Sequence, residues 1–115
     1  MNTIKVAEFT KEAASKKRGL ELKGLLDDYL KKECEITVDF EGITRFASPF
    51  FNNSFSALAL EYGFQAIRSI TLSNLSQVGK ETFDASLQNA EMIYNNPRYA
   101  EKIQGIVNII PEGAE

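Results

Sequence analysis

The pattern of hydrophobic and polar residues changes its period once within residues 36–64, and this segment organises the prediction for the whole chain. Ile36, Val38 and Phe40 alternate with polar residues, which is the period-two pattern of a β-strand. A polar stretch with a glycine follows at residues 41–47. The pattern therefore predicts a strand that runs into a loop.

A helix is predicted directly after this loop. Ser48 stands before Pro49, and serine as the N-cap with proline in the first helical position is typical of a helix start. Gly63 is predicted to end the helix. Its inner face is predicted from apolar residues at helical spacing: Phe51, Phe55, Leu58 and Tyr62. Phe50 falls on the neighbouring stripe, so we expect it to be only partly buried.

Periodic patterns elsewhere predict the remaining elements. Residues 3–9 and 66–72 have the short alternation of strands, and residues 81–94 have the spacing of a helix. Residues 22–30 form an amphipathic helix in this prediction, whose buried face consists of Leu22, Leu25, Leu26, Tyr29 and Leu30. Residues 95–115 are predicted as a short helix and a loose tail.

The alternation of strands and helices predicts an α/β fold that spans residues 1–115 as one small domain. Asp39 lies between two apolar residues of the central strand, which leaves one face of that strand polar. A strand covered on both faces would be apolar almost throughout. We therefore expect a mixed β-sheet with the helices packed mainly on one face.

The composition narrows the range of partners. The chain has 115 residues, 43% of them hydrophobic, and a net charge of −3, which argues against broad binding to nucleic acid or to an anionic membrane. A local basic cluster at Lys16, Lys17 and Arg18 suits an acidic partner or is a solvated run. No segment has the ~18 consecutive apolar residues of a membrane span, and no apolar signal segment is present, so a cytoplasmic location is predicted.

The residue types favour a protein that is not an enzyme. The chain has no histidine, one cysteine and no glycine-rich phosphate loop, so neither a metal site nor a cofactor is predicted. Cys34 is interpreted as a buried structural thiol. Asp39 and Glu41 are interpreted as loop-bracing groups, and an enzyme that uses both with Arg45 would need an apolar-lined cleft that holds all three.

A candidate docking surface is predicted at the loop and the start of the second helix. Its residues combine an aromatic ring with short polar side chains: Thr44, Arg45, Ser48, Phe50, Asn52 and Asn53. Ser48 is interpreted first as a simple N-cap. The alternative is a phosphoacceptor, because a phosphate at a helix start would place nearly two negative charges on the surface.

Three segments together resemble a known signature. They are VDFEGITRFASPFFNNSF at residues 38–55, ITLSNLS at residues 70–76, and Arg18-Gly19 before the first amphipathic helix. In this order they resemble the bacterial STAS-like domain family of unknown function, within the superfamily of anti-sigma-factor antagonists. The resemblance implies a small α/β domain that docks a partner on its second helix. It also implies that the partner is a GHKL-type kinase or ATPase that phosphorylates a serine at the start of that helix.

The chain departs from the superfamily at this serine. The usual Asp-Ser-Ser-Gly motif falls on Ala47, Ser48, Pro49 and Phe50, so a proline stands at the phosphoacceptor position and Ser48 lies one residue early. We therefore expect a non-enzymatic interaction domain in signalling, with a GHKL-type protein as partner. A small-ligand module that senses a nucleotide or an anion is the alternative, and a homodimer is left open.

Overall fold

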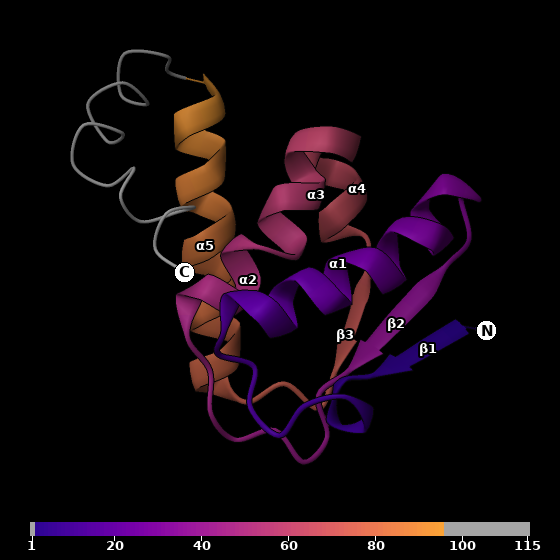
Figure 1. The fold of residues 1–115 in the computed structure, drawn as a ribbon. Coiled ribbons are helices and arrows are strands. Elements are labelled where there is room, and N and C mark those ends of the chain that lie inside the picture. Colours follow the sequence, from indigo (N-terminus) through magenta and orange to yellow (C-terminus); the bar gives the residue numbers. More distant parts are fainter. Residues whose placement is uncertain (1, 96–115) are drawn as a thin grey trace.

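The computed structural model describes residues 2–95, in which strands and helices alternate (Figure 1). The strands are β1 (Asn2–Lys5), β2 (Ile36–Asp39) and β3 (Thr71–Ser73). The helices are the 3-10 helix η1 (Val6–Glu8) and the α-helices α1 (Lys16–Lys31), α2 (Ser48–Asn52), α3 (Phe55–Tyr62), α4 (Phe64–Arg68) and α5 (Gln77–Asn95). The predicted α/β fold is confirmed.

The three strands form one sheet in the order β1-β2-β3. Both strand pairs are parallel, with Ile4 opposite Val38 and Val38 opposite Leu72. The prediction of a mixed sheet is thus wrong for the strands of residues 2–95. Parallel neighbours need a crossover connection, and α1 provides it between β1 and β2, while α2, α3 and α4 lie between β2 and β3.

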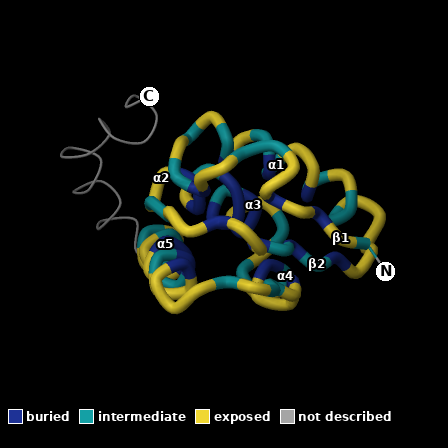
Figure 2. The backbone as a smooth tube through the Cα atoms, turned by 90° about the horizontal axis from the view of Figure 1, so that it is seen from below, coloured by how far each residue is buried: buried dark blue, intermediate teal, exposed yellow. Residues whose placement is uncertain are grey.

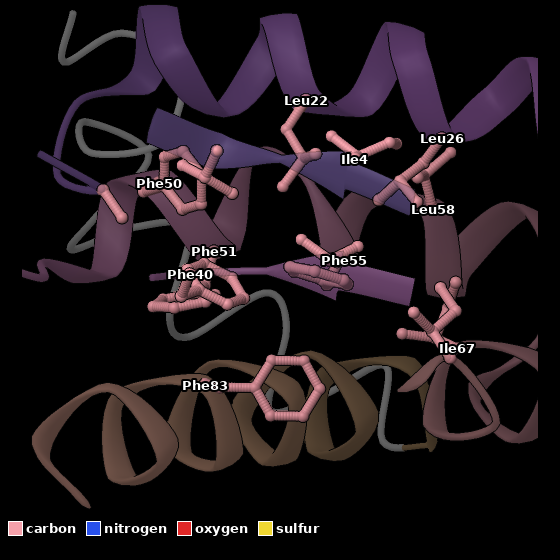
Figure 3. Close-up of a cluster of buried hydrophobic side chains, with 14 of the residues drawn as sticks. Ile4, Leu22, Leu26, Phe40, Phe50, Phe51, Phe55, Leu58, Ile67 and Phe83 are labelled. Carbon is pink, nitrogen blue, oxygen red and sulfur yellow. The ribbon is translucent and has the colours of Figure 1, made fainter. Parts of the chain in front are cut away.

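One face of the sheet is apolar and the other is polar. Ile4, Ile36 and Val38 are buried beneath the helices, whereas Thr3 and Thr71 on the opposite face are exposed. Figure 3 shows Ile4 close to Leu22, Leu26 and Leu58, which come from α1 and α3. The helices of the described residues therefore cover one face, as the polar side of the central strand predicts.

Helix α1 is longer than the helix predicted for residues 22–30. It begins at Lys16, and the Ser15 hydroxyl accepts a hydrogen bond from the Arg18 amide at 3.2 Å as the N-cap. Its inner face includes Leu22 and Leu26, both fully buried, as predicted. Leu25 is 43% exposed, so its predicted burial is wrong. The buried stripe follows α1 at the spacing of four that separates these two leucines, and Leu25 falls beside it.

The predicted single helix over residues 48–62 is two helices, α2 and α3. Side chains after α2 compete for its last carbonyl groups: the Asn53 amide donates to the Pro49 carbonyl at 2.8 Å, and the Ser54 hydroxyl to the Phe50 carbonyl at 2.7 Å. Such bonds offer the backbone an alternative to helix continuation. Gly63 follows α3 with φ of 99°, and it ends this helix as predicted.

Three other boundaries differ from the prediction. Strand β1 ends at Lys5, because η1 follows it directly. Residues 64–68 form α4, so only the end of the predicted third strand is correct, and α5 begins at Gln77 rather than at residue 81. Short apolar runs do not distinguish a strand from a buried helical segment by periodicity. The prediction for the chain end concerns residues that, after Asn95, lie outside the described part.

Phenylalanine rings fill the core between the sheet, α1 and α5 (Figure 3). Phe51 is fully buried and its ring lies 5.4–6.2 Å from five other rings, measured between centroids: those of Phe40, Phe46, Phe50, Phe55 and Phe83. Phe83 comes from α5, so this cluster joins α5 to the rest of the fold. Burying one such ring contributes roughly 1.5–3 kcal/mol.

Candidate functional site

Two loops that are far apart in the sequence meet at the carboxyl-terminal side of the sheet. The Ala13 amide donates to the Arg45 carbonyl, and the Ala47 amide donates to the Ala13 carbonyl, both at 3.0 Å. Ala13 and Phe46 thereby form an isolated parallel bridge. The loop after β1 and the loop after β2 are thus joined through their backbones, and we call this contact the loop junction.

The loop junction is held from the core side. Ala13 is fully buried, and the Phe46 ring stacks on the Phe51 ring with centroids 6.2 Å apart. Phe46 also packs against Phe40 at 6.0 Å. A loop fixed by a buried ring and by backbone hydrogen bonds presents its outward side chains in one arrangement.

The outward side chains include several of the predicted site residues. Thr44, Arg45, Ser48 and Pro49 are exposed, and we call these four residues the docking surface. An Arg45 nitrogen lies 3.9 Å from a Glu12 carboxylate oxygen, and both side chains are more than half exposed. Such a surface pair holds the arginine only weakly, so Arg45 is accessible to another charged group.

Ser48 does not cap α2. The N-cap is Ala47, which has no side chain able to accept a hydrogen bond, and Ser48 is the first residue of the helix. The interpretation of Ser48 as an N-cap is therefore wrong by one position. Its hydroxyl lies on the exposed side of the helix start, which leaves the phosphoacceptor alternative as a prediction.

Phe50 is fully buried, so the prediction of partial exposure is wrong. Its ring packs edge-on against Phe51, with centroids 5.4 Å apart. Its backbone also lies against Gly19 of α1, where an added Cβ would come within 2.5 Å of the Phe50 carbonyl oxygen. Phe50 and Phe51 are thus both buried, although they are neighbours in the same short helix. Phe50 therefore contributes no side-chain area to a docking surface in the folded protein.

The two asparagines at the end of α2 have structural partners. The Asn52 side-chain oxygen accepts a hydrogen bond from the Ser86 hydroxyl of α5, and Ser86 shares a second bond of 2.7 Å with Ser56 of α3. Asn53 bonds to the Pro49 carbonyl. Asn52 remains exposed at its outer side. The two amides thus stabilise the helix arrangement beside the docking surface.

Sequence reasoning missed the part that the loop after β1 plays. Lys11 and Glu12 lie next to the bridging Ala13, and both are exposed. Nothing in the local pattern indicates that Ala13 pairs with Phe46, since the two are 33 positions apart and lie outside the strands. The neighbouring basic cluster of residues 16–18 was interpreted either as a contact for an acidic partner or as a solvated run, and neither interpretation predicts the bridge.

Asp39 braces the turn that follows β2, as the sequence predicts. Its carboxylate accepts hydrogen bonds from the Asn74 side chain at 2.8 Å and from the Glu41 amide at 2.9 Å. The bond from Asn74 and then that from Glu41 lower the pKa of the Asp39 carboxyl. Asn74 follows β3 directly and has a positive φ of 55°. In this conformation its side chain reaches Asp39 at the end of β2.

This brace predicts a pH dependence of stability. The folded-state pKa of Asp39 lies below the unfolded value, so the carboxylate stabilises the fold above about pH 4 and this contribution is lost as the pH falls through the folded pKa. Asn74→Gly keeps the backbone conformation and removes the side chain. We expect a lower urea midpoint at about pH 7 and a smaller loss of stability towards about pH 3.

Asn89→Ala is the control for this substitution, because Asn89 is exposed on α5. It is expected to leave the pH dependence as in the wild type. A pH dependence that stays unchanged in Asn74→Gly would show that the Asn74 side chain does not lower the pKa of Asp39.

Two depressions lie near the ends of the sheet. An open one of about 640 Å³ is lined by residues 7–12 and by Ala14, Ser15 and Arg18, and a second of about 340 Å³ has Cys34 in its wall. Neither is lined by Asp39, Glu41 or Arg45, so neither provides the cleft that an enzyme using all three would need.

Cys34 is exposed, so its interpretation as a buried thiol is wrong; its amide bonds to the Tyr29 carbonyl in the turn after α1. Among residues 2–95, no group of three acidic or cysteine side chains is placed to hold a metal ion. Within the same residues, no helix has the length and apolar character needed to cross a membrane.

Comparison with known proteins gives one match. A family model described as a STAS-like domain of unknown function matches residues 19–80, which is more than half of the chain. The match begins at Gly19, where α1 contacts α2, and ends in the first turn of α5, so it includes the docking surface. No curated protein and no solved structure matches the chain. The chain therefore belongs to the family of STAS-like domains of unknown function.

Proposed function

We propose that this protein is a cytoplasmic, non-enzymatic regulatory domain that binds a partner protein through the docking surface of Thr44, Arg45, Ser48 and Pro49. The partner class that the resemblance implies is a GHKL-type ATPase or kinase. The exposed thiol of Cys34 is consistent with the reducing conditions of a cytoplasm.

The observation that carries this proposal is the bridge between Ala13 and Phe46. It fixes the loop that bears Thr44 and Arg45 before any partner arrives, and a preformed surface loses less conformational entropy on binding. The start of α2 continues this surface through Ser48. The docking surface is polar and has no ring of its own, since Phe50 is buried. We therefore expect its partner to bind through hydrogen bonds and charge rather than through an apolar pocket.

Regulation by phosphorylation is part of the proposal at Ser48. The hydroxyl is exposed and caps no helix, so a kinase reaches it without unfolding α2. A phosphate there would add nearly two negative charges to a surface whose charged member is Arg45. Intact-mass analysis of protein purified from its native cells, followed by peptide mapping of residues 41–53, tests this directly.

Replacing Arg45 with glutamate is expected to weaken partner binding at least about tenfold, because a charge reversed at an interface turns attraction into repulsion. The Arg45 side chain is largely exposed, and its ion pair with Glu12 within the described residues is long, at 3.9 Å. The fold is therefore expected to remain intact. The measurement is capture of partners from native cells by the immobilised protein, with and without ATP, quantified by mass spectrometry.

Lys32→Glu is the matched control for this experiment. Lys32 is exposed at the far end of α1, and its replacement changes the net charge by the same amount. An ATPase or kinase retained by wild type and by Lys32→Glu, but not by Arg45→Glu, supports the proposal. Equal retention by all three proteins would contradict it.

A small-ligand module is the second candidate, favoured by the depression of about 640 Å³. It lies after β1, and ligands of open α/β sheets bind outside the carboxyl ends of the strands. Lys11 and Arg18 contribute positive charge to it, while Glu8 and Glu12 oppose an anion. A rise in melting temperature with ATP, GTP or inorganic phosphate would favour this candidate over protein docking.

A further inference from the structure

Leu20 lies on the outer face of α1 and is 47% exposed, close to the exposed Gly24. At 100° per residue, Leu20 is about 40° from Gly24 around the helix. Leu25, which is 43% exposed, is about 100° from Gly24 on the other side and lies beside the buried stripe. In Figure 2, α1 runs along the outside of the molecule.

Gly24 is unfavourable in the isolated domain. A glycine inside a helix costs roughly 0.5–1 kcal/mol relative to alanine. Gly19 and Gly79 have a reason to lack a side chain, because an added Cβ would come within 2.5 Å of neighbouring atoms. At Gly24, an added Cβ would have no neighbour within 4 Å. The packing of the domain therefore does not explain this glycine.

The charges in the first turn of α1 oppose its dipole, whereas Lys31 in the last turn favours it. Lys16, Lys17 and Arg18 occupy the first turn, at the positive end of the helix, and no acidic residue lies there. Asp27 and Asp28 lie towards the negative end. Arg18 pairs with Glu21, and Asp27 pairs with Lys31.

Two of these charges have no ion-pair partner among residues 2–95. Lys17 and Asp28 are exposed and belong to none of the ion pairs in this part of the chain. With Gly24, they form a stripe along the outer face of α1, since residues seven and four apart lie on one side of a helix. Lys31 lies on the same stripe but is paired with Asp27. The unpaired charges of the stripe are therefore positive at one end and negative at the other, with no side chain at Gly24 in the middle.

We propose that this face binds the same face of a second copy of the chain, with the two α1 helices antiparallel. The twofold axis then passes between Leu22 and Lys23, which places Lys17 of each copy beside Asp28 of the other. A twofold interface uses the same patch on both subunits, and the charge stripe of α1 is complementary to itself only in this orientation. The helix dipoles also oppose each other favourably.

The apolar residues fit the same arrangement. The twofold axis keeps each flank of α1 against the same flank of the second copy, so Leu20 lies alongside the Leu20 of the second copy. Leu25 is about 100° from Gly24 and stays at the edge of this contact. Gly24 leaves room for Glu21 of the second copy, which the axis places opposite it. An exposed leucine that becomes buried contributes to association through its apolar area.

The interface is small, so we expect a weak dimer. A helix of 16 residues is about 24 Å long, and such a contact falls at the low end of interface sizes, below about 1,200 Å². Sedimentation of the full chain from about 10 µM to about 1 mM covers the range in which such a dimer forms. We expect the weight-average mass to rise from one chain towards two.

The charge pairs give a decisive test. Lys17→Asp and Asp28→Lys each place like charges at both contacts, so each variant is expected to dimerise at least about tenfold more weakly than wild type. Mixed in equal amounts, the two variants are expected to form a heterodimer, because every contact then joins opposite charges. The double variant restores both pairs and is expected to dimerise like wild type.

These variants separate association from folding. Each substitution places a charge that favours its own end of the helix dipole, so each is expected to leave the unfolding midpoint unchanged or slightly raised. A wild type that is monomeric over the whole range overturns the proposal. A dimer that neither single variant weakens, or a mixture that does not assemble, overturns the α1 interface. Capture of a partner through Arg45 is measured independently, so failure of one proposal is distinguishable from failure of the other.

Discussion

Replacing Phe51 with alanine is expected to destabilise the domain by about 3–5 kcal/mol. Phe51 is fully buried and its ring packs against five others, which come from the loop after β2, from α2 and α3, and from α5. These neighbours belong to several elements, so they cannot all move into the cavity. Small domains are stable by about 5–15 kcal/mol, so the loss takes a large part of the total.

Urea denaturation followed by circular dichroism measures this loss, with Phe64→Ala as the matched control. Phe64 is only partly buried, and within residues 2–95 its one ring neighbour is Tyr94, at 5.9 Å. Its replacement is expected to cost less than half as much as that of Phe51. If both variants unfold at the same urea concentration, the rings around Phe51 do not form the centre of the core.

The same cluster explains why the sequence placed Phe50 wrongly. In one continuous helix from residue 48 to residue 62, Phe50 falls outside the buried stripe that contains Phe51. The chain breaks after α2, and with this break the helical phase no longer relates the two rings to the residues of α3. Asn53 and Ser54 carry the signal for the break, because their side chains compete for helix carbonyl groups. A hydrophobic pattern alone does not contain this information.

The elements that were predicted correctly are those with a clear period. The alternation of β2 and the spacing of Leu22 and Leu26 in α1 each fix a buried face. The polar residues of β2 also predict the uncovered face of the sheet. Residues 66–68, the first part of the predicted third strand, were predicted wrongly because a short apolar run fits either state. Their helical state follows from tertiary packing, which buries Ile67 completely.

The candidate site was only partly predictable for a related reason. The exposure of Thr44 and Arg45 could be predicted, because the sequence shows that they lie in a polar loop. Their fixed position follows from the bridge between Ala13 and Phe46, and this bridge depends on how two loops meet at the end of a parallel sheet. Residues that contact each other over such a separation in sequence leave no periodic signal. The docking surface is therefore a product of the fold rather than of a local motif.

Replacing Gly19 with alanine is expected to destabilise the domain by about 1–3 kcal/mol, although alanine is the better helix former. A Cβ at this position would lie 2.5 Å from the Phe50 carbonyl oxygen and 3.1 Å from the Phe50 Cα. These are backbone atoms of α2, which cannot rotate away as the end of a side chain can. The added methyl group therefore moves α1 away from α2, and with α2 the rings of Phe50 and Phe51.

Gly24→Ala is the matched control, because the same change is made five residues further along the same helix. No atom lies within 4 Å of its added Cβ, so a gain of about 0.5–1 kcal/mol is expected. Unfolding at about 1 µM protein keeps a weak dimer dissociated, and the difference between the two variants then measures the contact of α1 with α2. Two variants of equal stability would show that the helices do not meet at Gly19. If Gly19→Ala lowers the stability and Gly24→Ala raises it, the Arg18-Gly19 pair of the family resemblance has a physical reason. Only glycine at position 19 then lets α1 pack closely against α2, the helix that begins at the docking surface.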